Sequence, residues 1–169
     1  MVESPTIKGA LNRLGLQHPT AKTLVVHHSE TTDVPPAKLW AILEDVDQWS
    51  RWSRPIHERA RWLEKRNFEF GARFEQVRHK GFPIGRQVTV ETVREVNPGT
   101  SVAWWDGDGG LKSCRMWVFE IQPDGTTRVT STEVYQSFLV MIAKPILRKR
   151  WNRLNKKSVD GLIERAKRN

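Results

Sequence analysis

Three strand-like segments carry the residues best suited to binding a ligand, because they place polar and apolar side chains on the same face. Successive side chains of a strand point to opposite faces, so every second residue shares a face. The alternation groups one set of eight residues: Phe74, Gln76, Arg78, Val102, Trp104, Val129, Ser131 and Glu133. Apolar pockets with a few placed polar groups are typical of small-ligand sites. We therefore expect these side chains to point inward and to contact a small apolar or amphipathic ligand.

The charged pair in this set admits more than one role. Inside an apolar pocket, Arg78 or Glu133 would orient the carbonyl or hydroxyl group of a ligand. Alternatively, the two side chains pair with each other or reach solvent. If the protein is an enzyme, Glu133 is the candidate general acid or base, because a cavity that orients its substrate needs only one such group.

The histidines do not converge on a site. His27 and His28 are adjacent in a strand-like segment, so their side chains point to opposite faces. His57 and His79 lie near expected turns, where we expect structural or exposed roles.

Metal and redox chemistry are not indicated by the remaining residue types. Cys114 is the single cysteine, which excludes an intrachain disulfide and favours the role of a small buried apolar residue. The sequence contains neither His-x-His nor Cys-x-x-Cys, and the segment beginning Asp106-x-Asp108 lacks the Gly and Glu that a calcium loop requires. We expect no metal and no cofactor.

The elements that position these residues follow from the hydrophobic period. Leu39, Ile42 and Leu43 recur at helical spacing after two prolines, and a second short helix is expected around Trp49 and Trp52. Seven strands are expected from alternation and from turn residues such as those at 97–99: 23–32, 56–64, 72–79, 86–96, 101–105, 111–122 and 126–135. Consecutive strands joined by tight turns predict an antiparallel meander.

The helical period returns from Phe138 to Lys167, with Pro145 expected to kink this helix or to mark its true first turn. The net charge of the chain is +9, and residues 144–169 hold ten basic residues against Asp160 and Glu164. The basic helix has three alternative interpretations: a solvated face, a contact with an anionic membrane surface, or a contact with nucleic acid, which we consider the weakest.

Length and composition fit one domain over residues 21–169 after a lead-in segment over residues 1–20. Hydrophobic residues make up 38% of the chain, and no run approaches the roughly 18 apolar residues needed to span a bilayer. The first fifteen residues lack the apolar core of a signal peptide, so we expect a cytoplasmic protein.

Four segments in order resemble a known family. They are the Pro-x-x-Leu-Trp opening that runs through Asp45 to Trp49-x-x-Trp52, then Gly71-x-x-Phe74, the Val93 to Trp104 hairpin with its Glu95 and Pro98, and Gly125 to Glu133. Together they resemble the polyketide cyclase/dehydrase-like branch of the START-like (SRPBCC) helix-grip superfamily, from about Lys22 to the C-terminus. The resemblance implies an α+β fold in which a curved antiparallel sheet of about seven strands wraps around a long C-terminal helix. Two short helices would follow the first strand.

In such a fold a hydrophobic ligand would lie between the sheet and the C-terminal helix, where Ile142 and Leu147 would add to its contacts. Phe82 and Ile84, in the turn at 80–85, would act as a flap at the mouth. The expected function is binding, transport or sequestration of a small hydrophobic molecule. The alternatives are a cyclase or dehydratase acting on polyketides, and an adaptor that uses the basic helix.

Overall fold

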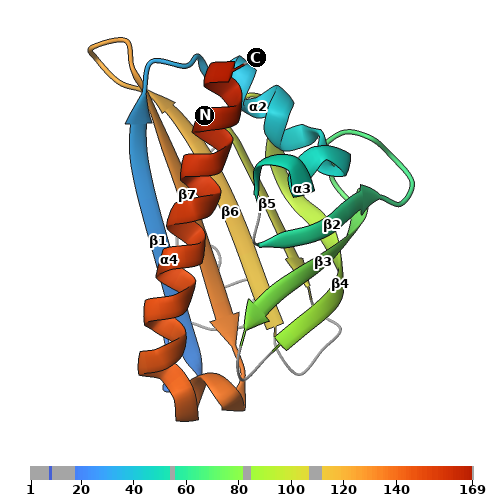
Figure 1. Cartoon of the computed structure of the whole chain (residues 1–169), viewed down its shortest axis with the longest axis vertical. Coiled ribbons are helices and arrows are strands. Elements are labelled where there is room, and N and C mark those ends of the chain that lie inside the picture. The colour runs from blue at the N-terminus through green and yellow to red at the C-terminus, as the bar shows by residue number, and fades with distance from the viewer. Residues whose placement is uncertain (1–7, 9–17, 54–55, 82–84, 107–111, 169) are drawn as a thin grey trace.

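In the part of the chain that the structure describes, seven antiparallel strands and a long helix form the framework (Figure 1). The computed structural model describes residues 8, 18–53, 56–81, 85–106 and 112–168. The strands are β1 (Thr23–Thr32), β2 (His57–Trp62), β3 (Arg73–Gly81), β4 (Gly85–Asn97), β5 (Ser101–Asp106), β6 (Lys112–Ile121) and β7 (Thr127–Gln136). The helices are α2 (Pro36–Glu44), the 3₁₀ turn η1 (Val46–Gln48), α3 (Trp49–Trp52) and α4 (Phe138–Arg168).

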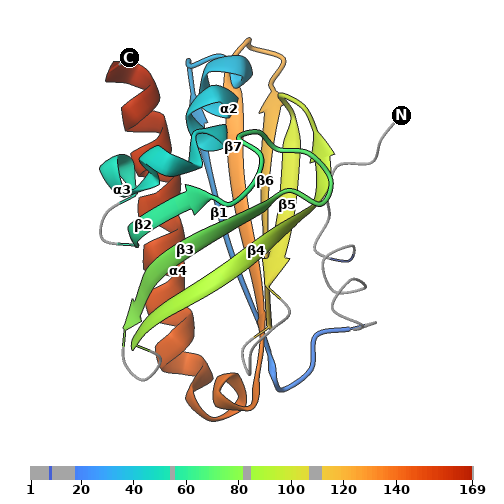
Figure 2. The ribbon, with the colours of Figure 1, turned by 90° about the vertical axis from the view of Figure 1, so that its right-hand side faces the viewer.

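The sheet has the strand order β1-β7-β6-β5-β4-β3-β2, and every neighbouring pair is antiparallel. Strands β2 to β7 follow one another along the sheet, and β1 adds to β7 at its edge. The sheet bends around α4, which lies along its concave side (Figures 1 and 2). The predicted α+β helix-grip fold is confirmed, including the short helices that follow the first strand. The division into residues 1–20 and 21–169 stays a prediction, because most of the first segment lies outside the described residues.

Helix α4 is broken near its start. Ala143 has φ −109° and ψ 16°, outside the helical region, and Pro145 follows two residues later. Proline removes a backbone donor and clashes with the preceding turn, so the chain bends before it and restarts the helix. The kink that the sequence predicted at Pro145 is confirmed. Among the described residues, no helix combines the length and the apolarity that crossing a membrane requires.

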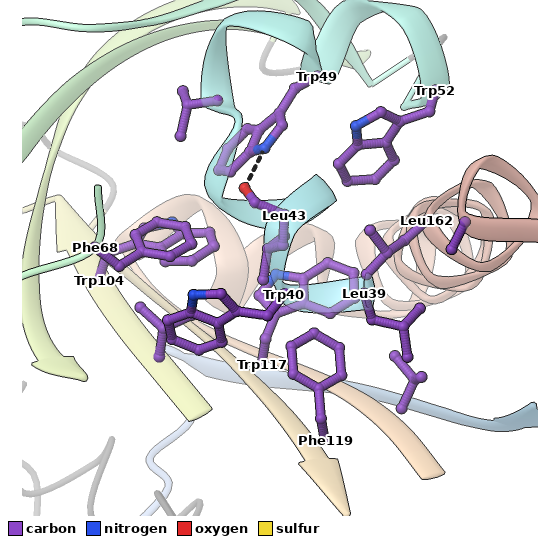
Figure 3. Close-up of a cluster of buried hydrophobic side chains, with 14 of the residues drawn as sticks. Leu39, Trp40, Leu43, Trp49, Trp52, Phe68, Trp104, Trp117, Phe119 and Leu162 are labelled. Atoms are coloured by element: carbon purple, nitrogen blue, oxygen red, sulfur yellow. Dashed lines mark hydrogen bonds between the residues drawn. The ribbon is translucent and has the colours of Figure 1, made fainter. Parts of the chain in front are cut away.

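In the half of the interior next to α2 and α3, the space between the sheet and the helices is filled by aromatic side chains (Figure 3). Trp49 contacts Phe74 and Trp104 at ring-centroid distances of 5.2 and 5.5 Å, and its indole N–H donates to the Leu43 carbonyl at 2.7 Å. Phe68 stacks on Trp104 at 5.6 Å. Edge-on and stacked contacts of this kind stabilise a core beyond the area that they bury. This half of the interior is a packed core.

Candidate functional site

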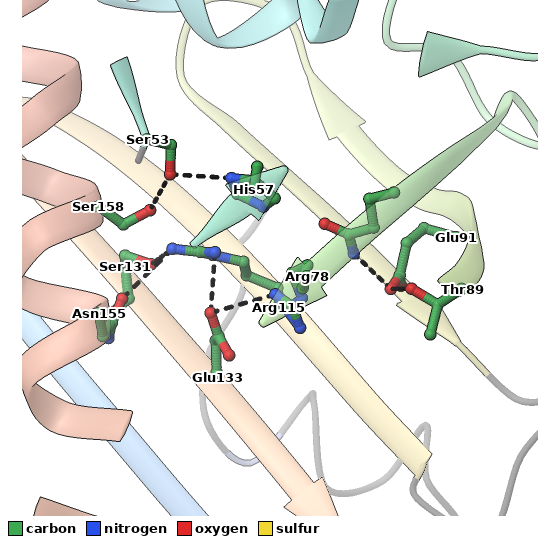
Figure 4. Close-up of polar contacts among 11 residues, drawn as sticks. Ser53, His57, Arg78, Thr89, Glu91, Arg115, Ser131, Glu133, Asn155 and Ser158 are labelled. Atoms are coloured by element: carbon green, nitrogen blue, oxygen red, sulfur yellow. Dashed lines mark hydrogen bonds and ion pairs between the residues drawn. The ribbon is translucent and has the colours of Figure 1, made fainter. Parts of the chain in front are cut away.

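A buried polar network lies next to the aromatic core, between the sheet and α4 (Figure 4). At its centre the Glu133 carboxylate contacts two guanidinium groups, Arg115 at 2.9 Å and Arg78 at 3.7 Å. The side chains of all three are at most 7% exposed. Strand alternation brings the three side chains into contact, because the residues occupy inward positions of β7, β6 and β3. The predicted pairing of Arg78 with Glu133 is therefore present, but a second arginine is the closer partner.

The second arginine is tied to both the sheet and the helix. The Arg115 guanidinium donates to the Ser131 hydroxyl at 3.3 Å and to the Asn155 side-chain oxygen at 3.5 Å. Asn155 in turn donates to the Ser131 carbonyl at 2.9 Å. Burial lowers the pKa of Arg115 from its ordinary value to about 10, and the Glu133 charge opposes part of that shift. Arg115 thus remains a cation at neutral pH.

Two further polar groups flank this ion cluster. On one side Gln76 donates to Glu91 at 2.6 Å, and Thr89 donates to the same carboxylate oxygen at 3.0 Å. On the other side the His57 ring shares a hydrogen bond of 2.8 Å with the Ser53 hydroxyl. The network therefore extends across β2, β3 and β4 as well as β6 and β7.

His57 is held in its neutral form. Burial lowers its pKa well below 6.5, and the nearby charges of Arg78 and Arg115 lower it further. Its ring packs 5.0 Å from that of Trp49. The expected structural role of this histidine agrees with its 2% exposure.

This depressed pKa predicts a pH-dependent loss of stability. Below about pH 6.5 the unfolded chain protonates His57 while the folded chain does not, so the free energy of unfolding falls as pH falls, by up to about 1.4 kcal/mol per pH unit. Urea unfolding between about pH 7.5 and pH 5 should show this slope, and His57→Gln should make it shallower. A slope unchanged in His57→Gln would contradict the assignment.

A pocket lies beside the ion cluster, between the sheet and α4. Its volume is about 10 Å³, roughly the space in which one water molecule can be centred. It is lined by Ile56, Arg78, His79, Glu133, Tyr135, Trp151, Leu154 and Asn155. In the conformation seen here, the described residues leave no space at this pocket for a molecule much larger than water.

Two buried N–H groups of the lining lack a hydrogen-bond partner among the described residues: the Nε of Arg78 and the indole Nε1 of Trp151. Buried donors without an acceptor are costly and are uncommon in native proteins. The Trp151 ring is held against Tyr135, with ring centroids 3.9 Å apart. The pocket therefore combines an aromatic wall with donors that fit an oxygen acceptor.

The residues predicted to contact a ligand divide into separate groups in the structure. Arg78 and Glu133 line the pocket, whereas Gln76 and Ser131 lie in the buried network around it. Four apolar members belong to the packed aromatic core and do not line the pocket: Phe74, Val102, Trp104 and Val129.

The remaining predicted contacts lie elsewhere. Leu147 is buried against β1 and β7 in a second apolar cluster with Tyr135 and Trp151. Ile142 is 66% exposed on the first turns of α4. Phe82 and Ile84 are outside the described residues, so the flap stays a prediction.

Sequence reasoning missed Arg115 and Asn155 as site residues. Arg115 is an inward residue of β6, two positions before the buried Trp117, so alternation along that strand was a sufficient signal. Asn155 lies on the apolar stripe of α4, four residues after Trp151. A polar residue on a buried stripe is informative because it needs a buried partner.

One cluster of metal-ligand residue types lies outside the pocket. His28, Glu30 and Asp160 bring potential ligand atoms within 4.8 Å of one another. However, the Lys156 ammonium contacts both carboxylates at 3.1 Å and already compensates their charge. The cluster is therefore accounted for as a surface ion-pair network.

The sequence matches the model of a known protein family over most of its length. Residues 23–167 match the model of a family described as polyketide cyclase / dehydrase and lipid transport. A comparison with curated proteins found no match.

Three solved structures illustrate the likeness in fold. TTHA0849 from Thermus thermophilus has a TM-score of 0.72 and 16% identity over 86% of this chain and 98% of its own. A START superfamily protein from Mycobacterium smegmatis has a TM-score of 0.70 and 11% identity over 85% and 97%. The ZhuI aromatase/cyclase from Streptomyces sp. R1128 has a TM-score of 0.65 and 15% identity over 86% and 94%. At these identities the likeness concerns the fold.

Proposed function

Because the chain belongs to the polyketide cyclase/dehydrase and lipid transport family, we propose that it binds a small, mainly apolar molecule that carries an oxygen acceptor. The ligand would enter the pocket between α4 and the sheet and receive hydrogen bonds from Arg78 and Trp151. The observation that carries this proposal is the pair of buried, unpartnered donors in the pocket lining. A neutral or anionic oxygen would satisfy both donors.

Entry of such a ligand requires movement, because the pocket has a volume of about 10 Å³ and holds only about one water. The packed aromatic core is a poor candidate for that movement, since its side chains interlock on all sides. The border between α4 and the end of β3 is better suited, because His79 there is about half exposed. We expect α4 and β3 to separate around the pocket when the ligand binds.

Two fluorescent probes test the acceptor requirement. Anilinonaphthalene sulfonate joins an apolar ring system to an anionic oxygen group, whereas N-phenylnaphthylamine offers a similar ring system without oxygen. We expect Arg78→Met to weaken binding of the sulfonate probe about 10-fold or more, since a charged hydrogen bond is lost, with little change for the neutral probe. Trp151→Phe, which keeps a ring and removes only the N–H, should weaken the sulfonate probe less.

The same variants supply the controls. Arg115→Met changes a buried arginine that does not line the pocket, and it should affect the sulfonate probe less than Arg78→Met does. Equal losses for both probes in Arg78→Met would show that only the apolar wall matters. Native mass spectrometry of freshly purified protein then identifies a co-purifying molecule, which should carry a carbonyl, carboxylate or hydroxyl oxygen.

A cyclase or dehydratase role is the second candidate, and one observation favours it. Glu133 is a buried carboxylate in the pocket lining, where a substrate would be shielded from water. Incubation with a poly-β-ketone thioester, followed by mass spectrometry of the products, separates the two functions. Ring closure above the uncatalysed background would establish an enzyme, whereas recovery of unchanged thioester bound to the protein would support a binding role.

A further inference from the structure

Exposed apolar side chains gather on the first turns of α4. Phe138, Met141, Ile142 and Ile146 have exposed fractions of 60, 40, 66 and 64%. Residues three and four apart lie side by side on a helix, so Phe138, Met141 and Ile142 are neighbours before the kink at Ala143, and Ile146 is exposed on the first turn after it. Single exposed apolar residues are ordinary, but four large ones within nine positions mark a contact surface.

Unpaired cations surround this patch. Lys144, Arg148, Lys149 and Arg153 have no carboxylate partner among the described residues, and the sequence holds no Asp or Glu between Phe138 and Asp160.

In the distal part of α4, from Lys156 onward, several basic residues form ion pairs. Lys156 pairs with Glu30 and Asp160, Lys167 with Asp33, and Arg168 with Glu164. Lys157 and Arg165 are the distal basic residues without such an ion pair among the described residues, whereas Asp160 and Glu164 lie only in the distal part, so most of the uncompensated positive charge of α4 lies next to the exposed apolar residues.

The patch also lies at the pocket end of the molecule. The strand register places Thr23, Gln136 and Lys112 side by side at this end, next to the start of α4 (Figures 1 and 2). Lys22 and Lys112 add two exposed cations there. Tyr135 and His79, which line the pocket, lie one and two residues from the ends of their strands at the same end.

We propose that this surface docks the protein on an anionic membrane. We call it the docking end: Phe138, Met141, Lys144, Ile142, Ile146, Arg148, Lys149 and Arg153. Apolar side chains at a bilayer interface insert among the acyl chains, while neighbouring cations contact acidic headgroups. Because Tyr135 and His79 of the pocket lining lie near this end, docking would bring the pocket close to the lipid. The docking does not depend on which ligand the pocket takes.

The composition of the docking end distinguishes a membrane from a nucleic acid. Binding to a phosphate backbone needs the cations alone, and its affinity comes from counterion release. It would leave the four apolar side chains in water. An anionic bilayer uses both halves of the surface.

Vesicle sedimentation tests the proposal with the full chain. We expect binding to vesicles that contain phosphatidylglycerol, weak or no binding to pure phosphatidylcholine, and a decrease as salt is raised. Arg148→Glu/Lys149→Glu should weaken binding about 10-fold or more, since each cation near the surface contributes to the attraction. Ile142→Ser/Ile146→Ser should weaken it by a similar factor, because these side chains leave water on docking.

Matched variants away from the docking end supply the controls. Lys38→Glu/Arg51→Glu reverses two exposed charges on α2 and α3, and Ile121→Ser removes a side chain that is 72% exposed at the far end of β6. Both controls should bind vesicles like the wild type, and thermal unfolding should show that all variants fold.

Two outcomes would overturn the proposal. If the apolar variant binds vesicles like the wild type, the attraction is electrostatic only and no side chain inserts. If the protein does not bind vesicles but binds RNA or duplex DNA through Arg148 and Lys149, the surface is a nucleic-acid binding site.

Discussion

Replacing Glu133 with glutamine is expected to lower the free energy of unfolding by about 3–5 kcal/mol. The carboxylate is the shared partner of Arg115, at 2.9 Å, and of Arg78, at 3.7 Å, and all three side chains are buried. Glutamine keeps the shape but removes the charge, so two buried guanidinium groups lose the carboxylate that contacts both of them. Urea unfolding followed by far-UV circular dichroism measures the loss.

The origin of this loss is tested by removing the charges together. Arg78→Met/Arg115→Met/Glu133→Leu replaces the cluster by apolar side chains, and exchanges of this kind are often neutral or stabilising. We expect the triple variant to recover most of the stability that Glu133→Gln loses, although Ser131 and Asn155 lose a donor. If the triple variant is less stable than the single one, the hydrogen bonds rather than the buried charges control stability here.

The comparison also bears on function. Recovery of stability together with loss of sulfonate-probe binding would mean that the cluster is retained for the ligand at no benefit to folding. Stability and binding lost in parallel would instead mean that the pocket depends on the cluster for its shape.

Trp49→Ala is expected to destabilise the fold by about 3–5 kcal/mol through the cavity that it opens. Trp49 is 1% exposed, and its ring contacts those of Trp52, Phe74 and Trp104. Because these neighbours hold one another in place, they can collapse only partly into the empty space. Thermal and urea unfolding of the variant measure the effect.

Trp49→Phe separates the packing contribution from the hydrogen bond. Phenylalanine keeps most of the aromatic contacts but leaves the Leu43 carbonyl without its 2.7 Å donor, so we expect a smaller loss of about 1–3 kcal/mol. Ile121→Ser, at an exposed position, should change stability little. A Trp49→Ala variant as stable as the wild type would show that the aromatic core is loosely packed and has room for a ligand.

That result would bear on where a ligand lies. The sequence predicted an aromatic lining from Phe74 and Trp104, because their spacing places them on inward faces. They are inward, and they contact one another at 5.4 Å within the core. Alternation determines the side of the sheet on which a residue lies, but it carries no information about whether that side is filled.

Local patterns in the sequence were sufficient to predict the helices and strands. The first strand over residues 23–32, the short helix after Pro35 and the kink near Pro145 all follow from side-chain period and proline geometry, which act within a few residues. The resemblance of four sequence motifs was sufficient to predict the fold. The family model matches residues 23–167, which include all four motifs.

Only the tertiary structure determined which part of the interior is packed core, which part holds the buried ion cluster and which part forms the pocket. Arg115, Glu133 and Asn155 are separated by up to 40 residues in the chain, and the distances between them depend on how β6, β7 and α4 pack. The same holds for the exposed Ile142 and Ile146, which helical period alone could have assigned to either side of a kinked helix. A sequence sets the direction of a side chain through local geometry, whereas its partners and the space around it depend on contacts between distant segments.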